Sequence, residues 1–480
     1  MKNILFIMTD QHRYDHVGYS GCGKVDTPNI DRISQGTAFT RCNTVNPICQ
    51  PARTALAAGR YPHQIGTLAM SGDFSLQIPT FMKALQKKGY QTEAVGKLHY
   101  LQTWHWGAQR GKVLDLTGLN GKIREYGYDY VWEAAGKQLM EKSYCDYSRY
   151  LEDRGLYEQY LDFAAASGPN YDTPDKRPQD NGEPFPLPEE HYPDIVIADR
   201  VIERIKNRPA NKPLMMLCSF LCPHKPFDPP ASYLDRQEYR EEDDFIPGKK
   251  PLSEEDKKHL YRKRRAYRAM IHLIDDQVGR LFKVLEEEGI LDETVIIFTS
   301  DHGEMMGDHF LIQKSVPYKE AVTVPTAVRH PDYLTGGVNS SPVELTDLTA
   351  TILELAGLDP QKALGREWPA FNNIIPCRSL MPVIRGEAGQ IREFAFTECS
   401  NEWQMIQTKD WKYIYYPARN MEDSPAELFF DSRKDPEELV NLAGRSEYQE
   451  AVEWCRSRRI SVMDTTPAAQ LTWASLNLTE

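Results

Sequence analysis

The run Ile4-Leu-Phe-Ile-Met8, followed by Thr9, Asp10 and Gln11, decides the fold class of this chain. Five apolar residues in a row that lead to an acid and an amide are typical of a strand buried on both faces. The run is too short for a signal peptide and has no small-residue cleavage site. We therefore expect a buried strand here, with polar groups at its carboxyl end.

Three later apolar runs repeat this form, and stretches with helical periodicity precede them. The runs are Thr92–Val95, Leu214–Phe220 and Thr294–Thr299, and the helical stretches are Phe81–Lys88, Ile195–Ile205 and Tyr267–Leu285. Buried strands that alternate with amphipathic helices build a sheet that is covered on both faces. We predict an α/β fold with a large, mostly parallel or mixed sheet sandwiched by helices.

Polar groups follow each of the four apolar runs. They are Asp10-Gln11, Gly96-Lys97-Leu98-His99, Pro223-His224 and Asp301-His302. In open α/β sheets, ligands bind outside the carboxyl ends of the strands. We therefore expect these groups to converge at one edge of the sheet, although they are far apart in the sequence.

Two of these groups favour a divalent metal. Asp10 and Asp301 supply oxygen ligands, Gln11 adds an amide oxygen and His302 adds an imidazole. A single Asp at a strand end more often caps the next turn. Two such acids, each after an apolar run, favour an oxygen-rich metal site. We expect Ca²⁺ first, with Mg²⁺ or Mn²⁺ as alternatives.

The last quarter of the chain has a different composition. Prolines gather over residues 360–390, and the elements expected beyond them are two aromatic-rich antiparallel strands and a helix, at Glu393–Thr397, Trp411–Tyr416 and Glu447–Ser457. We predict a catalytic α/β domain over residues 1–375 and a smaller C-terminal α+β subdomain over residues 376–480.

Composition bounds the class of protein. The chain has 480 residues, 41% of them hydrophobic, a net charge of −12 and nine scattered cysteines. The negative charge argues against nucleic acid as a partner, and no segment is apolar enough to span a membrane. Unpaired cysteine spacing favours a reducing compartment. We expect a cytoplasmic protein, or a periplasmic one if a signal has been removed, and leave a homo-oligomer open.

One cysteine stands out by its context. Cys49 begins the run Cys-Gln-Pro-Ala-Arg53, which continues as Thr-Ala-Leu-Ala-Ala-Gly-Arg60. This Cys-x-Pro-x-Arg run resembles the signature of type I sulfatases, which belong to the alkaline phosphatase superfamily. Further blocks similar to those of the family follow its order, at Thr27–Asp31, Gly89-Tyr90, Pro223–Pro226, Ser300–Glu304, Leu428–Asp431, Asp435-Pro436 and Asn441-Leu442. The resemblance thus covers most of the chain.

The resemblance implies the fold of alkaline phosphatases, with a small C-terminal sheet. It also implies that a formylglycine-generating maturation enzyme oxidises Cys49 to formylglycine. The modified residue would be the nucleophile and would share a metal with Asp10, Gln11, Asp301 and His302.

The same resemblance assigns roles to five cationic or ionisable residues. Lys97, His99, His224 and Lys314 match positions that contact the substrate, and Arg53 matches the position that holds the modified residue. Fixed cations stabilise the charge of a sulfate ester in the transition state, and a histidine can protonate the departing alcohol. A lone lysine is more often a solvated surface charge, so the role of Lys314 depends on the resemblance.

These observations predict a sulfuric ester hydrolase that cleaves a sulfate monoester, with a carbohydrate sulfate preferred and an aryl or alkyl (choline-like) sulfate as the alternative. Many sulfatases have Asp where Gln11 stands and Asn where His302 stands. The pairs Asp10-Gln11 and Asp301-His302 also occur in the related phosphonate monoester and phosphodiester hydrolases. Hydrolysis of those esters is therefore the first alternative activity. A non-catalytic protein that binds sulfated glycans, or a hydrolase that uses unmodified Cys49, are the remaining alternatives.

A substrate rim is expected from polar segments with little periodicity, residues 105–190 and 225–252. Trp104, His105 and Arg110 follow the Gly-Lys-x-His block closely enough to contact a bound molecule, with Trp106 between them. Two tryptophans near an arginine would suit binding of a sulfated sugar. The alternative is that these residues pack at the rim without contacting a ligand.

Overall fold

The structure is a computed structural model of the whole chain. It describes residues 1–102, 114–140, 142–167, 182–241, 244–249, 251–365, 375–418 and 424–464. Within these residues no helix is both long enough and apolar enough to cross a membrane.

The main sheet has the strand order β10-β2-β9-β8-β1-β7-β3-β5, with β11 paired to β2. Its strands are β1 (Asn3–Asp10), β2 (Thr37–Asn43), β3 (Gln91–Gly96), β5 (Tyr130–Glu133), β7 (Leu214–Pro223), β8 (Thr294–Ser300), β9 (Thr323–Arg329), β10 (Gly337–Asn339) and β11 (Val343–Glu344). All neighbouring pairs are parallel except the two made by β9, which runs antiparallel to β2 and β8. The predicted mostly parallel sheet is confirmed.

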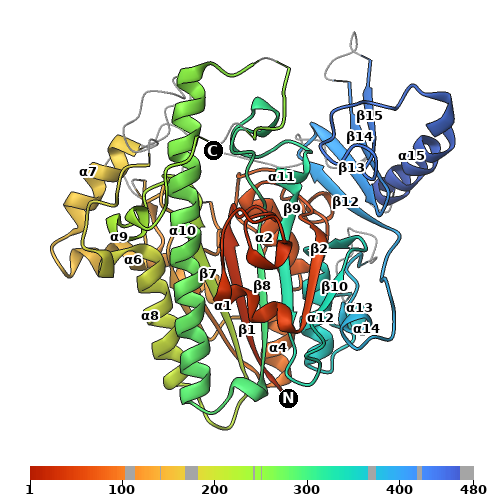
Figure 1. Cartoon of the computed structure of the whole chain (residues 1–480). Coiled ribbons are helices and arrows are strands. Elements are labelled where there is room, and N and C mark those ends of the chain that lie inside the picture. Colours follow the sequence, from red (N-terminus) through yellow and green to blue (C-terminus); the bar gives the residue numbers. More distant parts are fainter. Residues whose placement is uncertain are drawn as a thin grey trace, which may run out of the picture.

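Helices cover both faces of this sheet (Figure 1). Leu5 and Ile7 of β1 pack with the helices α8 (Pro193–Lys206) and α10 (Glu254–Glu287). Phe6 and Met8, which point to the opposite face, pack in a second cluster. Its helices are α2 (Cys49–Ala58), α4 (Phe81–Lys88) and α12 (Asp347–Leu355). The alternation along β1 therefore explains why its sequence is apolar throughout: each face meets its own helical layer.

The strand register places four polar segments at one edge of the sheet. In the parallel ladders Thr9 lies opposite Ser300, Asp10 opposite Pro223, and Gly96 opposite Ser219. Because β8, β1, β7 and β3 are consecutive and parallel, the residues that follow them emerge side by side. This confirms the predicted convergence of the strand ends.

A smaller antiparallel sheet follows in the chain and packs beside the main unit (Figure 1). Its order is β12 (Phe394–Cys399), β13 (Trp403–Thr408), β14 (Trp411–Tyr416) and β15 (Ala426–Asp431), and α15 (Gln449–Asp464) follows it. The predicted strands at Glu393–Thr397 and Trp411–Tyr416 and the predicted helix are confirmed. The exact boundary between residues 375 and 376 stays a prediction.

The segment 105–190 holds more regular structure than its sequence indicates. Its described part contains β5, an edge strand of the main sheet, together with β4 (Leu114–Asp115), β6 (Ser143–Tyr144), α5 (Asn120–Arg124), α6 (Asp146–Glu152) and α7 (Tyr157–Ser167). The weak periodicity of this segment therefore hides regular elements, and the predicted substrate rim stays a prediction. Tyr147 and Tyr160 are buried there, so a second layer of aromatic packing orders polar sequence that has no clear period.

The remaining short helices connect these layers. They are α1 (Pro28–Asp31), α3 (Pro62–Ile65), α9 (Ala231–Asp235), α11 (Lys319–Val322), α13 (Pro360–Leu364) and α14 (Met381–Ile384).

Candidate active site

Four potential metal-ligating side chains meet at the carboxyl edge of the main sheet. Asp10 ends β1, Asp301 and His302 follow β8, and Cys49 is the first residue of α2. One ligand atom from each lies within 4.8 Å of the others, and all four residues are buried. The structure therefore brings together four of the five residues that the sequence predicted as metal ligands.

Cys49 lies at the centre of this cluster. Its Sγ is 3.2 Å from His302 Nε2, 3.1 Å from Lys314 Nζ and 3.7 Å from Asp10 Oδ1. Burial opposes ionisation, but the charges of Lys314, Lys97 and His302 hold the pKa of the Cys49 thiol well below its ordinary value. The first turn of α2 adds the partial positive charge of a helix N-terminus. Position 49 is thus built to carry negative charge.

Two buried ion pairs neutralise the carboxylates. Lys97 Nζ lies 2.5 Å from Asp10 Oδ2, and Arg53 Nε donates to Asp301 Oδ2 at 2.8 Å. Burial and the Cys49 charge raise the pKa of Asp10, but Lys97, His224 and Arg53 outweigh them and keep it below its usual range. Asp10 is therefore available as an ionised ligand, and the Asp301 carboxyl group faces a fixed cation.

Arg53 also fixes the end of β3. Its Nη1 donates to the carbonyl oxygen of Lys97 at 2.6 Å and to Ser219 Oγ at 2.8 Å. Ser219, on β7, was not singled out in the sequence, because a serine within a buried strand carries no distinguishing pattern. The guanidinium thus holds α2, β3 and β7 in one geometry around residue 49.

Gln11 and Lys314 complete the cluster. Lys314 Nζ lies 2.9 Å from Gln11 Oε1 and 3.1 Å from His302 Nε2, besides its contact with Cys49. His302 Nδ1 is 3.0 Å from the carbonyl of Gly303, which makes Nδ1 the protonated nitrogen and leaves Nε2 with its lone pair toward the cluster. The ammonium group thus lies among three predicted metal ligands, so these atoms already accommodate a positive charge.

The C-terminal sheet supports the loop that carries Lys314. Trp403 Nε1 donates to the carbonyl of Ser315 at 3.0 Å, and Lys412 Nζ donates to that of Pro317 at 3.0 Å. Ser315 has a left-handed backbone, φ 75°. Because this conformation is unfavourable for a residue with a side chain, external contacts are needed to hold it.

Two histidines face the cysteine from the other strands. His224 follows β7, and its Nδ1 is 2.8 Å from the carbonyl of Lys225, which makes Nε2 the nitrogen available to Cys49. His99 follows β3 and is buried. Burial lowers the pKa of both imidazoles, while a hydrogen bond to Cys49 raises it in each case. Neutral imidazoles at this place suit proton transfer near neutral pH.

Glu133 is a buried carboxyl group that sequence reasoning missed. It ends β5, and its Oε1 accepts the backbone N–H of His99 at 3.3 Å. His99 has φ 58°, so the carboxyl group helps to hold an unfavourable backbone conformation. Burial raises the pKa of Glu133 to about 7 despite that hydrogen bond. No sequence signal marks this residue, because the contact depends on pairing between β3 and β5.

Some predicted site residues are not placed at the cluster. Trp104, His105 and Arg110, with Trp106, lie outside the described residues. The roles predicted for all site residues, as metal ligands, catalytic groups or rim groups, stay predictions.

The arrangement is suited to chemistry on an anionic ester. Two carboxyl groups, an amide oxygen and an imidazole nitrogen are a donor set that can hold a hard divalent cation. Lys97 and Lys314 add fixed positive charge beside residue 49, and His99 and His224 can transfer protons. Such a site stabilises negative charge that grows on a substrate during displacement.

Comparisons with known proteins agree with this chemistry. The family model described as Sulfatase matches residues 2–358, and one described as N-sulphoglucosamine sulphohydrolase, C-terminal, matches residues 307–463. An arylsulfatase of Clostridium perfringens (strain 13 / Type A) is 29% identical over 492 aligned positions, which cover 96% of this chain and 94% of that protein. An N-acetylglucosamine-6-O-sulfatase of Bacteroides thetaiotaomicron is 27% identical, covering 93% and 83% of the two chains.

A solved structure shows the same fold. The phosphonate monoester hydrolase of Agrobacterium radiobacter superposes with a TM-score of 0.74 at 23% identity, and the alignment covers 97% of this chain and 96% of that chain. The α/β fold with a C-terminal antiparallel sheet is therefore shared with that hydrolase.

Glu133→Gln tests the buried carboxyl group behind His99 through its pH dependence. An unfolded glutamate ionises near 4.5, whereas the folded group ionises near 7. Between these values the wild-type protein loses stability as pH rises, because the folded state retains a proton that the unfolded state releases. We expect Glu133→Gln to gain stability relative to wild type over this interval, by about 3 kcal/mol at most. Thermal unfolding of both proteins at pH 4.5–8 measures this difference, and a difference that does not change with pH contradicts the assignment.

Proposed function

This chain belongs to the sulfatase family and is a sulfuric ester hydrolase, and we propose that it cleaves a sulfate monoester of a carbohydrate with residue 49 as the nucleophile. The observation that carries the proposal is the position of Cys49 Sγ, among buried Asp10, Asp301 and His302 and 3.1 Å from Lys314 Nζ. A nucleophile placed among fixed cations and metal-ligating groups is suited to attack on an anionic ester. The preference for a carbohydrate is supported by the relative described as an N-acetylglucosamine-6-O-sulfatase.

The proposal includes oxidation of Cys49 to formylglycine by a maturation enzyme. The run Cys-Gln-Pro-Ala-Arg53 supports it, together with membership of the family. A hydrated aldehyde supplies two oxygens on one carbon, so that one oxygen can attack sulfur and the other can assist release of sulfate. The positive surroundings that lower the pKa of the Cys49 thiol would equally stabilise an ionised oxygen there.

A divalent cation fits the donor set of this site. Asp10, Asp301, Gln11 and His302 would hold it together with an oxygen of residue 49, and Ca²⁺ is the preferred ion because most donors are oxygens. The Lys314 ammonium group lies among Gln11 Oε1, Cys49 Sγ and His302 Nε2. This position supports the proposal that these three atoms bind a cation. When bound, the cation supplies Lewis-acid polarisation of the sulfate ester and lowers the pKa of an attached hydroxyl.

The remaining residues of the site would orient the ester and move protons. Lys97 and Lys314 would offer their ammonium groups to the peripheral oxygens of a sulfate, and so would offset charge in the transition state. His224 is partly exposed, and the nearby Asp10 carboxylate favours its protonated form. We assign to that protonated ring the proton donated to the departing sugar oxygen. His99 is enclosed beside residue 49 and would take the proton that must leave that residue before sulfate is released.

A second candidate is hydrolysis of phosphonate monoesters or phosphodiesters. It is favoured by the Gln11 and His302 pairing and by the likeness of the whole fold to a phosphonate monoester hydrolase. Both activities use a nucleophile at position 49, so that residue does not separate them.

Replacing Cys49 tests the nucleophile. We expect Cys49→Ala to lower turnover of a sulfate ester at least about a thousandfold, because in the described part of the chain Cys49 is the nucleophile that lies among the candidate metal ligands. Cys22→Ala is a matched control, since Cys22 is a free but exposed cysteine. Peptide mass spectrometry on protein made with a maturation enzyme should find the aldehyde form of residue 49. Undiminished turnover in Cys49→Ala would contradict the proposal.

A comparison of esters on one preparation tests the substrate class. Specificity constants kcat/KM would be measured for defined sulfated monosaccharides, an aryl sulfate, choline sulfate, a phenyl phosphonate and a phosphodiester. We expect the highest value for a sulfated sugar, in line with the relative described as an N-acetylglucosamine-6-O-sulfatase. A phosphonate or phosphodiester that exceeds every sulfate ester would favour the second candidate, and activity confined to aryl or choline sulfate would contradict the carbohydrate preference.

A further inference from the structure

We infer that Glu304 is a positioning residue that fixes which end of the Gln11 amide faces the cluster and ties it to the loop of Lys314. The inference rests on the proposed function, because it treats Gln11 as a metal ligand. Glu304 lies two residues beyond His302 and is buried, with 2% of its surface exposed. None of the roles assigned above involves this residue.

The first step concerns the two ends of the Gln11 amide. Its Nε2 donates to Glu304 Oε2, while its Oε1 faces Lys314 Nζ at 2.9 Å. An ionised carboxylate only accepts hydrogen bonds, so it can face the amide NH₂ but not the amide oxygen. Turning the amide over would place oxygen against carboxylate and NH₂ against the cationic side of the site. Glu304 thereby makes Oε1 the atom that is presented to a cation.

The second step concerns the backbone of Gln11, which is held independently. Gln11 has φ 67°, its N–H donates to Asp301 Oδ1 at 3.0 Å, and its carbonyl accepts from Tyr267 at 2.7 Å. The main chain of this residue is thus fixed in place. The side-chain amide of Gln11 could still turn over, and its hydrogen bond to Glu304 prevents this rotation.

The third step concerns the other oxygen of the same carboxylate. Glu304 Oε1 accepts the backbone N–H groups of Met306, at 3.1 Å, and of Gln313. Gln313 precedes Lys314, and its carbonyl accepts from the N–H of Met305 at 2.8 Å. One carboxylate therefore links a predicted metal ligand to the loop that carries a predicted substrate-contacting lysine.

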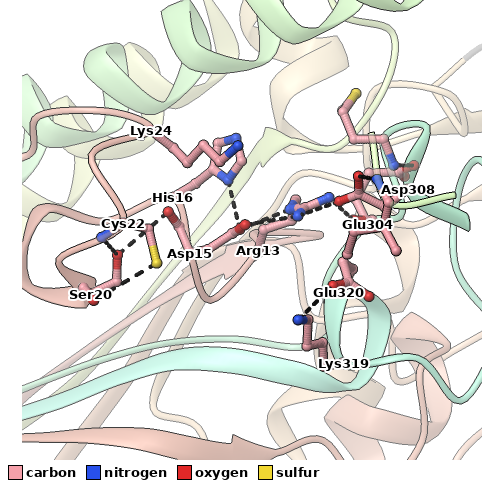
Figure 2. Close-up of polar contacts among 12 residues, drawn as sticks. Arg13, Asp15, His16, Ser20, Cys22, Lys24, Glu304, Asp308, Lys319 and Glu320 are labelled. Atoms are coloured by element: carbon pink, nitrogen blue, oxygen red, sulfur yellow. Dashed lines mark hydrogen bonds and ion pairs between the residues drawn. The ribbon is translucent and has the colours of Figure 1, made fainter. Parts of the chain in front are cut away.

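The fourth step concerns the partners of the Glu304 side chain. The nearby guanidinium of Arg13 pairs with Asp15 and with Asp308, at 2.8 Å in each case, and its hydrogen bond to Glu304 is made to the backbone carbonyl (Figure 2). The Glu304 carboxyl group accepts hydrogen bonds from the Gln11 amide and from two backbone N–H groups. A glutamate at position 11 would place a second carboxyl group directly against this one.

These contacts define an isosteric exchange. In Glu304→Gln, the new Oε1 can still accept the two backbone N–H groups, but its NH₂ then faces the NH₂ of Gln11. In the pair Gln11→Glu with Glu304→Gln, the NH₂ of residue 304 donates to the carboxylate of residue 11. The exchange therefore keeps every hydrogen bond and reverses the direction of one.

The experiment measures Ca²⁺ affinity by titration calorimetry after removal of metal with a chelator. The proteins are wild type, Glu304→Gln, Gln11→Glu and the exchanged pair, all made with the maturation enzyme and matched for modification of residue 49. We expect Glu304→Gln to weaken Ca²⁺ binding about 10–100-fold, as is typical when a group that orients a metal ligand is lost. If the effects of Glu304→Gln and Gln11→Glu on Ca²⁺ affinity were independent, their product would give the affinity of the exchanged pair. We expect the exchanged pair to bind Ca²⁺ at least about fivefold more tightly than that product.

Glu320→Gln is the matched control. Glu320 is a buried carboxyl group of α11, and its backbone carbonyl accepts from the N–H of Glu304 at 2.9 Å (Figure 2). Among the described residues, no hydrogen bond or ion pair joins its side chain to Gln11. We expect this variant to keep wild-type Ca²⁺ affinity, and thermal unfolding of every variant reports whether it folds. If Glu304→Gln does not fold, a folded exchanged pair that binds Ca²⁺ still supports the inference.

Two outcomes separate this inference from the proposed function. Wild-type affinity in Glu304→Gln, or a folded exchanged pair with no recovery, overturns the role of Glu304 and leaves the proposed function intact. A wild-type protein with modified residue 49 that binds no divalent cation contradicts the metal in the proposed function, and the role of Glu304 with it.

Discussion

Charge compensation in a buried site is the constraint on which this structure depends. Two carboxylates and a thiol with a depressed pKa lie together out of water, and unpaired buried charges are costly by several kcal/mol each. Lys97 pairs with Asp10, Arg53 pairs with Asp301, and the Lys314 ammonium group contacts the sulfur of Cys49. These cations come from three different segments, so the fold must assemble the segments before the anions can be buried.

The parallel register of the central strands makes that assembly possible. Strands β8, β1, β7 and β3 are neighbours and end at the same level, so each delivers its polar residues to a shared edge. The C-terminal sheet then packs on the loop after Lys314 through Trp403. The smaller unit thus contributes to the site by holding a lysine in place.

Much of this could be predicted from the sequence, and the exceptions have a physical pattern. The buried strands and their polar ends were predictable, because continuous apolar runs and the residues after them are local features. The reversed strand β9 and the edge strand β5 were not, since pairing partners are not local. Glu133 was missed for the same reason, and Glu304 was quoted only as the end of the block Ser300–Glu304, without a role. Each acts through a hydrogen bond to a residue distant in the chain, which its local sequence does not reveal.

The account's central claim is that one divalent cation is shared by residue 49 and the ends of β1 and β8. A crystal structure of the matured protein soaked with Mn²⁺, with anomalous diffraction data, tests it most directly. The account predicts one anomalous peak within about 2.5 Å of Gln11 Oε1, His302 Nε2 and an oxygen of residue 49, with the Lys314 ammonium group displaced toward the substrate side. A peak elsewhere, or Lys314 still lying between Gln11 and His302 at full Mn²⁺ loading, would contradict it.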